Sequence, residues 1–206
     1  MTFVKQIGGA AALGAAMVIG AGLCAPPAQA AYTLTLEQVG SNVVATGSGT
    51  LDLAGLTFLS SATGVSGMTP ADGEITVGAV PTSLVIYRLV TGPMSFGGGG
   101  VTNASIGSGD NVGIDGLDEN LRVPTGYVSG ATLSSSATWD GQTLASLGVT
   151  PGVYVWTWEP LATATDDSFT LDAVAATVPE PASLALLALP LGLVMFVAAW
   201  RRGMAL

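Results

Sequence analysis

Histidine is absent from this 206-residue chain, and lysine and cysteine occur once each, at Lys5 and Cys24. These absences exclude Ser-His-Asp and Cys-His catalysis, zinc sites built from histidine or cysteine, and Schiff-base chemistry on a mid-chain lysine. Charged residues are scarce at 9%, while hydrophobic residues reach 49%, which excludes disorder driven by charge. The 14 acidic residues outnumber 5 basic ones, so the net charge is −9. Nucleic acid is excluded as a partner, because phosphate binding requires clustered lysine and arginine.

The first 30 residues have the three parts of a secretory signal peptide. Lys5 supplies the positive start, Ile7–Leu23 is an uncharged apolar run, and Pro26-Pro27-Ala28-Gln29-Ala30 ends in an A-x-A cleavage pattern. We expect the export machinery to recognise residues 1–30 and cleavage after Ala30 to leave Ala31 first. A retained N-terminal membrane anchor is the alternative. Cleavage would also remove the single cysteine, so the mature chain would contain no disulfide.

A second apolar segment, Ser183–Trp200, lies near the C-terminus and contains no charge. As a helix it would span about 27 Å, enough for a bilayer core. Pro190 in its middle would break most soluble helices but is tolerated inside a membrane. Arg201 and Arg202 follow at once, and the positive-inside rule keeps them in the cytoplasm with the tail 203–206. We therefore expect a transmembrane helix over 183–200 with the domain before it outside the inner membrane. A plain membrane anchor would have the same features.

The residues flanking this segment complete a three-part pattern. Val178-Pro179-Glu180-Pro181 precede the apolar run, and Arg201-Arg202 close it. In this order and spacing, residues 178–202 resemble the PEP-CTERM sorting signal of Gram-negative bacteria, although many such tails have a longer basic cluster. The resemblance implies that an exosortase, a membrane transpeptidase-like enzyme, acts near Pro179-Glu180-Pro181. It also implies that an inner-membrane-anchored precursor becomes a cell-surface or extracellular-matrix protein. Two prolines favour an extended, accessible backbone at this motif.

Residues 31–177 lie between the two signals and form the expected folded domain. Alternating or β-branched runs predict strands over residues 32–37, 50–53, 83–89, 153–158 and 168–174, with the last two forming a hairpin. Turn pairs such as Asp72-Gly73, Asp140-Gly141 and Pro151-Gly152 come often. The pattern predicts an all-β fold, a jelly-roll-like β-sandwich, with at most one short helix over 143–147. We expect the glycine-rich segment 96–100 to be a flexible loop.

One acidic cluster stands out within this domain, at residues 110–120. Asp110, Asp115, Asp118 and Glu119 could supply oxygen ligands to Ca²⁺ from a single loop, although their spacing does not match an EF-hand. The alternative is a solvated acidic loop without a metal. No other cofactor is expected.

Aromatic residues raise the question of a carbohydrate site. Trp139, Tyr154, Trp156 and Trp158 could stack on sugars if exposed, but alternate aromatics on a strand are equally the pattern of a core. Asp140 and Glu159 are conceivable as a glycosidase pair, yet nothing in the sequence places them across a cleft.

Residues with a side-chain hydroxyl are abundant, since 36 of residues 31–178 are Ser or Thr. They could occupy solvent-facing strand positions or carry O-glycosylation.

Together these features predict a non-catalytic exported surface or matrix protein that is sorted by an exosortase after transient anchoring in the inner membrane. A polysaccharide-binding module, assisted by Ca²⁺, is the alternative function, with extracellular polysaccharide as its partner.

Overall fold

The computed structural model describes residues 30–159 and 167–175, and this part of the chain folds as thirteen strands and one 3-10 helix. In chain order these are β1 (Ala31–Val39), β2 (Asn42–Thr50), β3 (Thr57–Gly64), β4 (Gly67–Thr69), η1 (Pro70–Asp72), β5 (Glu74–Val77), β6 (Thr82–Arg88), β7 (Thr102–Asn103), β8 (Ile106–Gly109), β9 (Val112–Asp115), β10 (Asn120–Pro124), β11 (Thr132–Trp139), β12 (Gly152–Trp158) and β13 (Asp167–Ala173). The predicted all-β class is confirmed.

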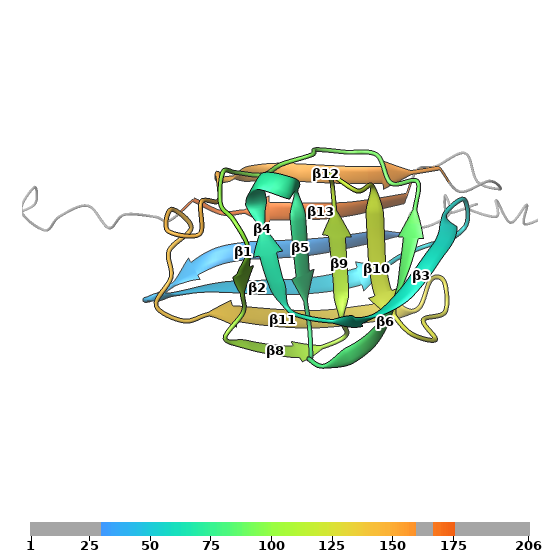
Figure 1. The fold of residues 1–206 in the computed structure, drawn as a ribbon, viewed down its shortest axis with the longest axis horizontal. Coiled ribbons are helices and arrows are strands. Elements are labelled where there is room, and N and C mark those ends of the chain that lie inside the picture. The colour runs from blue at the N-terminus through green and yellow to red at the C-terminus, as the bar shows by residue number, and fades with distance from the viewer. Residues whose placement is uncertain (1–29, 160–166, 176–206) are drawn as a thin grey trace, which may run out of the picture.

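Two sheets form the sandwich, and the strands of one run across those of the other (Figure 1). The six-stranded sheet has the order β12-β13-β1-β2-β11-β8, and the seven-stranded sheet has the order β3-β6-β10-β9-β5-β4-β7. Such crossing is one of the two ways in which sheets pack face to face. The space between the sheets holds the core.

β1 and β13 pair in parallel in the six-stranded sheet, whereas the other neighbours in this sheet are antiparallel. The register joins Ala31 to Ser168 and Leu36 to Ala173. Jelly rolls are antiparallel architectures, so this pair departs from the jelly-roll-like connectivity expected from the sequence. It also places the start of β1 and the end of β13 at opposite ends of the sheet (Figure 1).

Alternate residues of the central strands point between the sheets. β1 buries Tyr32 and Leu34, and its neighbour β13 buries Phe169 and Leu171. The rings of Tyr32 and Phe169 stack with centroids 5.3 Å apart, and Trp156 meets Phe169 edge-on at 6.0 Å. Each large side chain removed from water stabilises the fold by roughly 1.5–3 kcal/mol. The period-two pattern of the sequence therefore places one face of each strand in this core.

Gly47 on β2 leaves space for the Tyr32 phenol inside the core. The Tyr32 hydroxyl forms a hydrogen bond with Ser135 on β11, and burial raises the pKa of Tyr32 to about 12. A Cβ added at Gly47 would lie 2.0 Å from the Tyr32 hydroxyl oxygen, closer than atoms can approach. This strand glycine is therefore required for packing and does not mark a turn.

Most of the predicted strands are confirmed, including the β12–β13 hairpin, but two local predictions are wrong and the short helix considered for 143–147 does not form. β2 ends at Thr50, so residues 51–53 are not a strand. The segment 143–147 is a turn with a single helix-like bond, from Leu147 N to the Thr143 carbonyl, at 3.0 Å. The glycine-rich segment is tied to the fold, because Gly98 N donates to the Gly148 carbonyl at 2.9 Å.

No helix in residues 30–159 and 167–175 is long and apolar enough to cross a membrane. The predicted transmembrane helix 183–200 lies outside the described residues, as do residues 1–29 of the predicted signal peptide.

Candidate functional site

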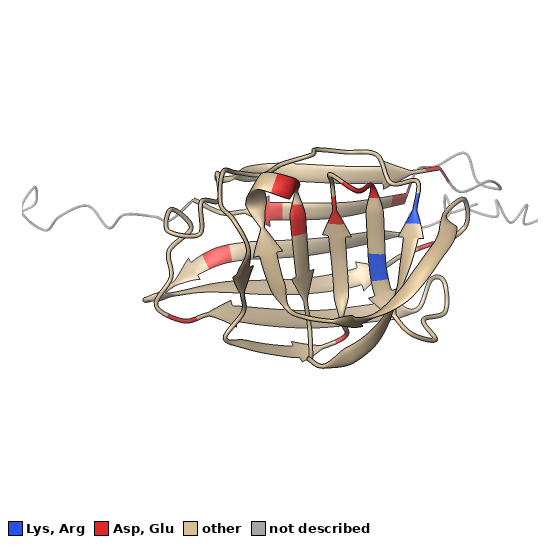
Figure 2. Cartoon of the chain, viewed as in Figure 1, with Lys and Arg blue, Asp and Glu red and all other residues tan. Residues whose placement is uncertain are grey.

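Three neighbouring strands bring charged side chains together on the outer face of the seven-stranded sheet. Arg122 on β10 forms ion pairs with Glu74 on β5 and Asp115 at the end of β9. Arg122 Nη2 lies 2.9 Å from Asp115 Oδ2, and Nη1 also donates to Thr76 Oγ1 at 3.1 Å. Figure 2 shows the basic residue of β10 beside acidic positions on β9 and β5. We call these four residues the Arg122 cluster.

Gly113 allows Arg122 to reach across β9. The register aligns Arg122 with Gly113, and Gly113 with Thr76 on the next strand. Directly opposed residues share one face of a sheet, and at this position β9 has no side chain to occupy that face. A Cβ at Gly113 would lie 2.4 Å from Thr76 Oγ1. The cluster therefore depends on the register of three strands and on one glycine.

The Arg122 cluster is largely shielded from water. The exposed fraction of the side chain is 17% for Arg122, 31% for Glu74 and 8% for Asp115. Burial raises the pKa of Asp115, while the Asp118 N–H at 3.1 Å and the charge of Arg122 act to lower it. Removing one partner of a buried ion pair typically costs about 3–5 kcal/mol, because a charge is left unpaired. The cluster thus joins β5, β9 and β10, and its carboxylates outnumber its cation.

A pocket of about 220 Å³ opens beside this cluster. Glu74, Thr76 and Arg122 form its polar side. The rest of its wall comes from β6, from the end of β3 and from the link between β3 and β4, namely Leu84, Ile86, Ala62, Thr63, Gly64 and Val65. A second hollow of about 80 Å³ shares Val65, Glu74 and Thr76 with it. The two hollows therefore adjoin on the same face of the sheet.

The four carboxylates predicted to bind Ca²⁺ do not come from one loop, which corrects that premise. Asp110 precedes β9, whereas Asp115, Asp118 and Glu119 lie at its far end. The four extended residues of β9 span about 13 Å. Asp110 Oδ2 instead accepts from Ser134 N at 2.8 Å. Within the described ranges, no three acidic, histidine or cysteine side chains gather closely enough to hold a metal ion.

The aromatic residues considered for sugar stacking belong to the core. Trp139, Trp156 and Trp158 are only 1%, 0% and 3% exposed. Each indole N–H has a backbone carbonyl partner, and that of Trp156 lies 2.9 Å from the oxygen of Pro93. Tyr154 is partly buried and packs against this core. These four residues therefore offer no exposed aromatic platform.

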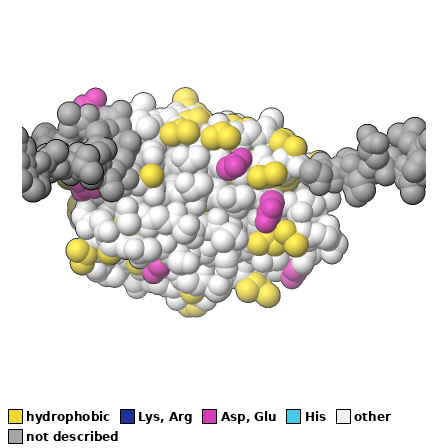
Figure 3. All heavy atoms as spheres, turned by 180° about the vertical axis from the view of Figure 1, so that it is seen from behind, with side chains coloured by type: hydrophobic (Ala, Val, Ile, Leu, Met, Phe, Trp, Pro, Cys, Tyr) yellow, Lys and Arg dark blue, Asp and Glu magenta, His cyan; other side chains and the backbone are white. Residues whose placement is uncertain are grey.

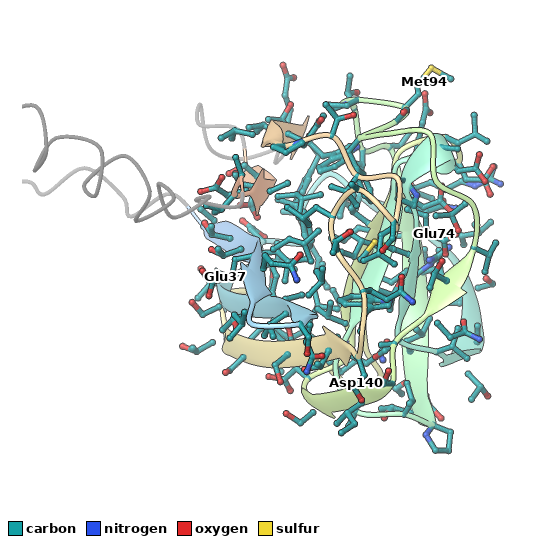
Figure 4. The ribbon with its side chains drawn as sticks, turned by 90° about the vertical axis from the view of Figure 1, so that its left-hand side faces the viewer. Glu37, Glu74, Met94 and Asp140 are labelled. Atoms are coloured by element: carbon teal, nitrogen blue, oxygen red, sulfur yellow. The ribbon has the colours of Figure 1, made fainter. Side chains whose placement is uncertain are left out.

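Asp140 and Glu159, considered as a glycosidase pair, lie at opposite ends of the six-stranded sheet. Asp140 follows β11, which runs in the same direction as β1, and Glu159 follows β12, which runs in the opposite direction. Figure 4, which faces one end of the sandwich, shows Asp140 at the lower edge of the view, with Glu37 and Glu74 on different sheets. Glycosidase carboxylates are about 5–10 Å apart, so this pair cannot act together.

A buried carboxylate that the sequence did not single out is Asp167, at the start of β13. Its side chain accepts hydrogen bonds from the backbone N–H groups of Asp52 and Ser168, and the residue is 1% exposed. Burial raises the pKa of Asp167 to about 6, although both hydrogen bonds act to lower it. The neighbouring Trp158 donates its indole N–H to the Asp52 carbonyl at 2.7 Å. Asp167 thus anchors the chain that follows β2.

Two of the predicted export residues, Ala30 and Ala31, lie in the described part of the chain, and Ala31 is the first residue of β1. The other predicted signal and sorting residues lie outside it, namely Ala28, Val178, Pro179, Glu180, Pro181, Arg201 and Arg202. Within the described residues, the Arg122 cluster combines hydrogen-bond donors and acceptors with an adjacent apolar wall. Such an arrangement suits binding of a small polar molecule. No protein-family model, curated protein or solved structure matches the chain.

Proposed function

We propose that this chain is the precursor of a non-catalytic protein of the cell surface or extracellular matrix. A signal peptidase removes residues 1–30, and the apolar segment 183–200 holds the domain outside the inner membrane. An exosortase then acts near Pro179-Glu180-Pro181 and passes the domain onward. The three-part pattern of residues 178–202 is the observation on which this proposal rests.

The boundaries of the fold support the proposal. β1 begins at Ala31, next to the predicted cleavage point, and β13 ends at Ala173. Only residues 174–177 separate β13 from the motif that starts at Val178. Four residues reach at most about 14 Å. During processing the folded domain would therefore lie close to the membrane, with the end of β13 toward it and Ala31 at the far end.

The outer face of the six-stranded sheet suits a hydrated extracellular environment. Its exposed positions include Thr33 on β1, Thr46 and Ser48 on β2, and Thr132 and Ser134 on β11. Figure 3 shows the molecule from behind, where scattered hydrophobic and a few acidic side chains lie among polar side chains and backbone, with no lysine or arginine in view. A hydroxyl-rich surface of one charge sign stays hydrated and resists self-association.

The test is the intact mass and cellular fraction of the native protein, in hosts with and without the exosortase. We expect an extracellular or surface form that starts at Ala31 and lacks the tail only when the enzyme is present. Mass beyond that of the processed chain would report O-glycosylation or an attached anchor. A full-length tail ending at Leu206 in the inner membrane of both hosts would refute the sorting step.

A further inference from the structure

The Arg122 guanidinium retains hydrogen-bonding capacity at the 220 Å³ pocket that it lines. An arginine side chain has five N–H donors. Three bonds are formed, to Glu74, Thr76 and Asp115. Two donors, Nε–H and one on Nη2, therefore have no partner among the described residues. A partly shielded arginine that keeps unused donors is prepared to bind a further acceptor.

The same cluster also contains hydrogen-bond acceptors. Glu74 is the most exposed carboxylate of the cluster, and its two oxygens each accept one bond, from Arg122 and from Thr69 Oγ1 at 3.3 Å. A carboxylate has about four lone-pair positions, so both oxygens can accept again. The Thr76 hydroxyl accepts from Arg122 and keeps its own proton to donate. A hydroxyl group entering the pocket could thus donate to Glu74 and accept from Arg122 at once.

Most of the remaining pocket lining is apolar. Ala62 on β3 lies directly beside Leu84 on β6, and Ile86 and Val65 extend this apolar lining. A ligand that fits must therefore have polar edges and a carbon–hydrogen face, which describes a sugar ring. The 220 Å³ volume is below the roughly 300–1,000 Å³ of drug-sized sites, so it accommodates a single ring. The adjoining 80 Å³ hollow, beyond Val65, leaves room for part of the next unit of a chain.

The charge of the cluster favours neutral sugars over charged ones. The Arg122 cluster contains two carboxylates and one guanidinium, and the domain from 31 to 178 has thirteen acidic residues against two arginines. Uronate or phosphate groups would be repelled by this field. A cationic ligand would meet the guanidinium that lines the pocket. Neutral hydroxyls pair with both signs without a net electrostatic cost.

We propose that the Arg122 pocket binds one ring of a neutral polysaccharide, whose hydroxyls bridge Arg122 and Glu74. The site gives the exported domain a ligand-binding role beyond the proposed sorting. It does not depend on tail processing, so either proposal can fail without the other.

The experiment measures binding of purified full-length protein to neutral hexasaccharides of glucose, mannose and galactose, with hexagalacturonate as the acidic counterpart. Arg122 itself is left unchanged, because its loss would leave two largely buried carboxylates without an ion-pair partner. Ala62→Phe fills the pocket from β3 and is expected to abolish binding. The matched control is Ser61→Phe, which places the same ring on the opposite side of β3, where it does not line the pocket. Glu74→Gln keeps one oxygen for Arg122 but removes the charge, and is expected to weaken binding at least tenfold.

The proposal is supported if a neutral hexasaccharide binds the wild-type protein and the Ser61→Phe variant equally well and does not bind the Ala62→Phe variant. The melting temperature of Ala62→Phe must equal that of the wild-type protein, which shows that the variant is folded. It is overturned if no neutral hexasaccharide binds, if hexagalacturonate binds more tightly than all of them, or if Ala62→Phe binds as well as the control. Equal loss of binding in both phenylalanine variants would also overturn it, because the effect would then not come from the pocket.

Discussion

The buried carboxylate of Asp167 predicts that the domain loses stability as the pH rises from 4 to 7. Folding raises the pKa of Asp167 from 3.8 to about 6, chiefly through burial. The folded state therefore holds a proton in a pH range where the unfolded chain has released it. Below pH 3.8 both states are protonated, and above pH 6 the folded state must contain a buried charge. Stability is thus highest at the acidic end of this window and falls toward neutral pH.

The size of the effect follows from the two pKa values. A difference of about two in pKa corresponds to about 3 kcal/mol between the protonation states. For a domain of this length, that equals roughly 6–12 °C in melting temperature. The carboxylate of Asp115 shifts in the same direction because it is also buried. We therefore expect urea unfolding, followed by tryptophan fluorescence, to show a higher midpoint at pH 4.5 than at pH 7.5.

Two variants separate Asp167 from the general effect of negative charge. Asp167→Asn removes the titrating group, so its free energy of unfolding should lose most of the expected dependence on pH. Asp172→Asn removes one charge from the outer face of the same strand. The free energy of unfolding of this variant should change with pH as it does in the wild-type protein. Parallel profiles for wild type and Asp167→Asn would refute the reasoning, since the proton would then be bound elsewhere.

Three further predictions concern packing and metal binding. Trp156→Ala should destabilise the domain by about 3–5 kcal/mol in urea unfolding, because it removes a fully buried indole and its bond to a backbone carbonyl; a loss below 1 kcal/mol would contradict its place in the core. Gly97→Ala should lower the melting temperature, because a Cβ there would lie 2.0 Å from the Gly148 carbonyl oxygen. The control Gly98→Ala should leave the melting temperature unchanged, because a Cβ there would have no atom within 4 Å. Calcium should not raise the melting temperature, because Asp115 is engaged by Arg122 and Asp110 lies at the other end of β9; a calorimetric titration with saturable heat would contradict this.

Local strand structure could be predicted where alternation is strict. β1 and β13 alternate apolar and polar residues along most of their length, and each buries the expected face. The prediction failed just after Thr50, although Asp52 fits the alternation. Its carboxylate accepts from Ala54 N at 2.9 Å and from the Ser129 hydroxyl at 2.7 Å, which bends the chain away from the sheet. A side chain that bonds to nearby backbone can end a strand that apolar periodicity alone would extend.

Alternating aromatics on β12 left two interpretations that only tertiary structure could separate. Tyr154, Trp156 and Trp158 share one face of the strand in either case. Their burial depends on which face the second sheet covers, and that is set by how the two sheets cross. The same holds for the Arg122 cluster, whose members come from β5, β9 and β10 and meet only through register. No spacing within one segment of the sequence could have indicated that they meet.

The position of Arg122 argues that it serves binding more than stability. The domain from 31 to 178 has only two arginines, Arg88 and Arg122, and Arg122 lies largely shielded from water against two carboxylates. Exposed ion pairs contribute about 0–1 kcal/mol. Buried ones are often matched or exceeded by apolar residues of similar size. An apolar side chain at position 122 would lie on the same face as Leu84 and Ile86 and would continue their surface. A guanidinium at a pocket, with two donors that the described residues leave unused, is therefore better explained by a ligand that uses them.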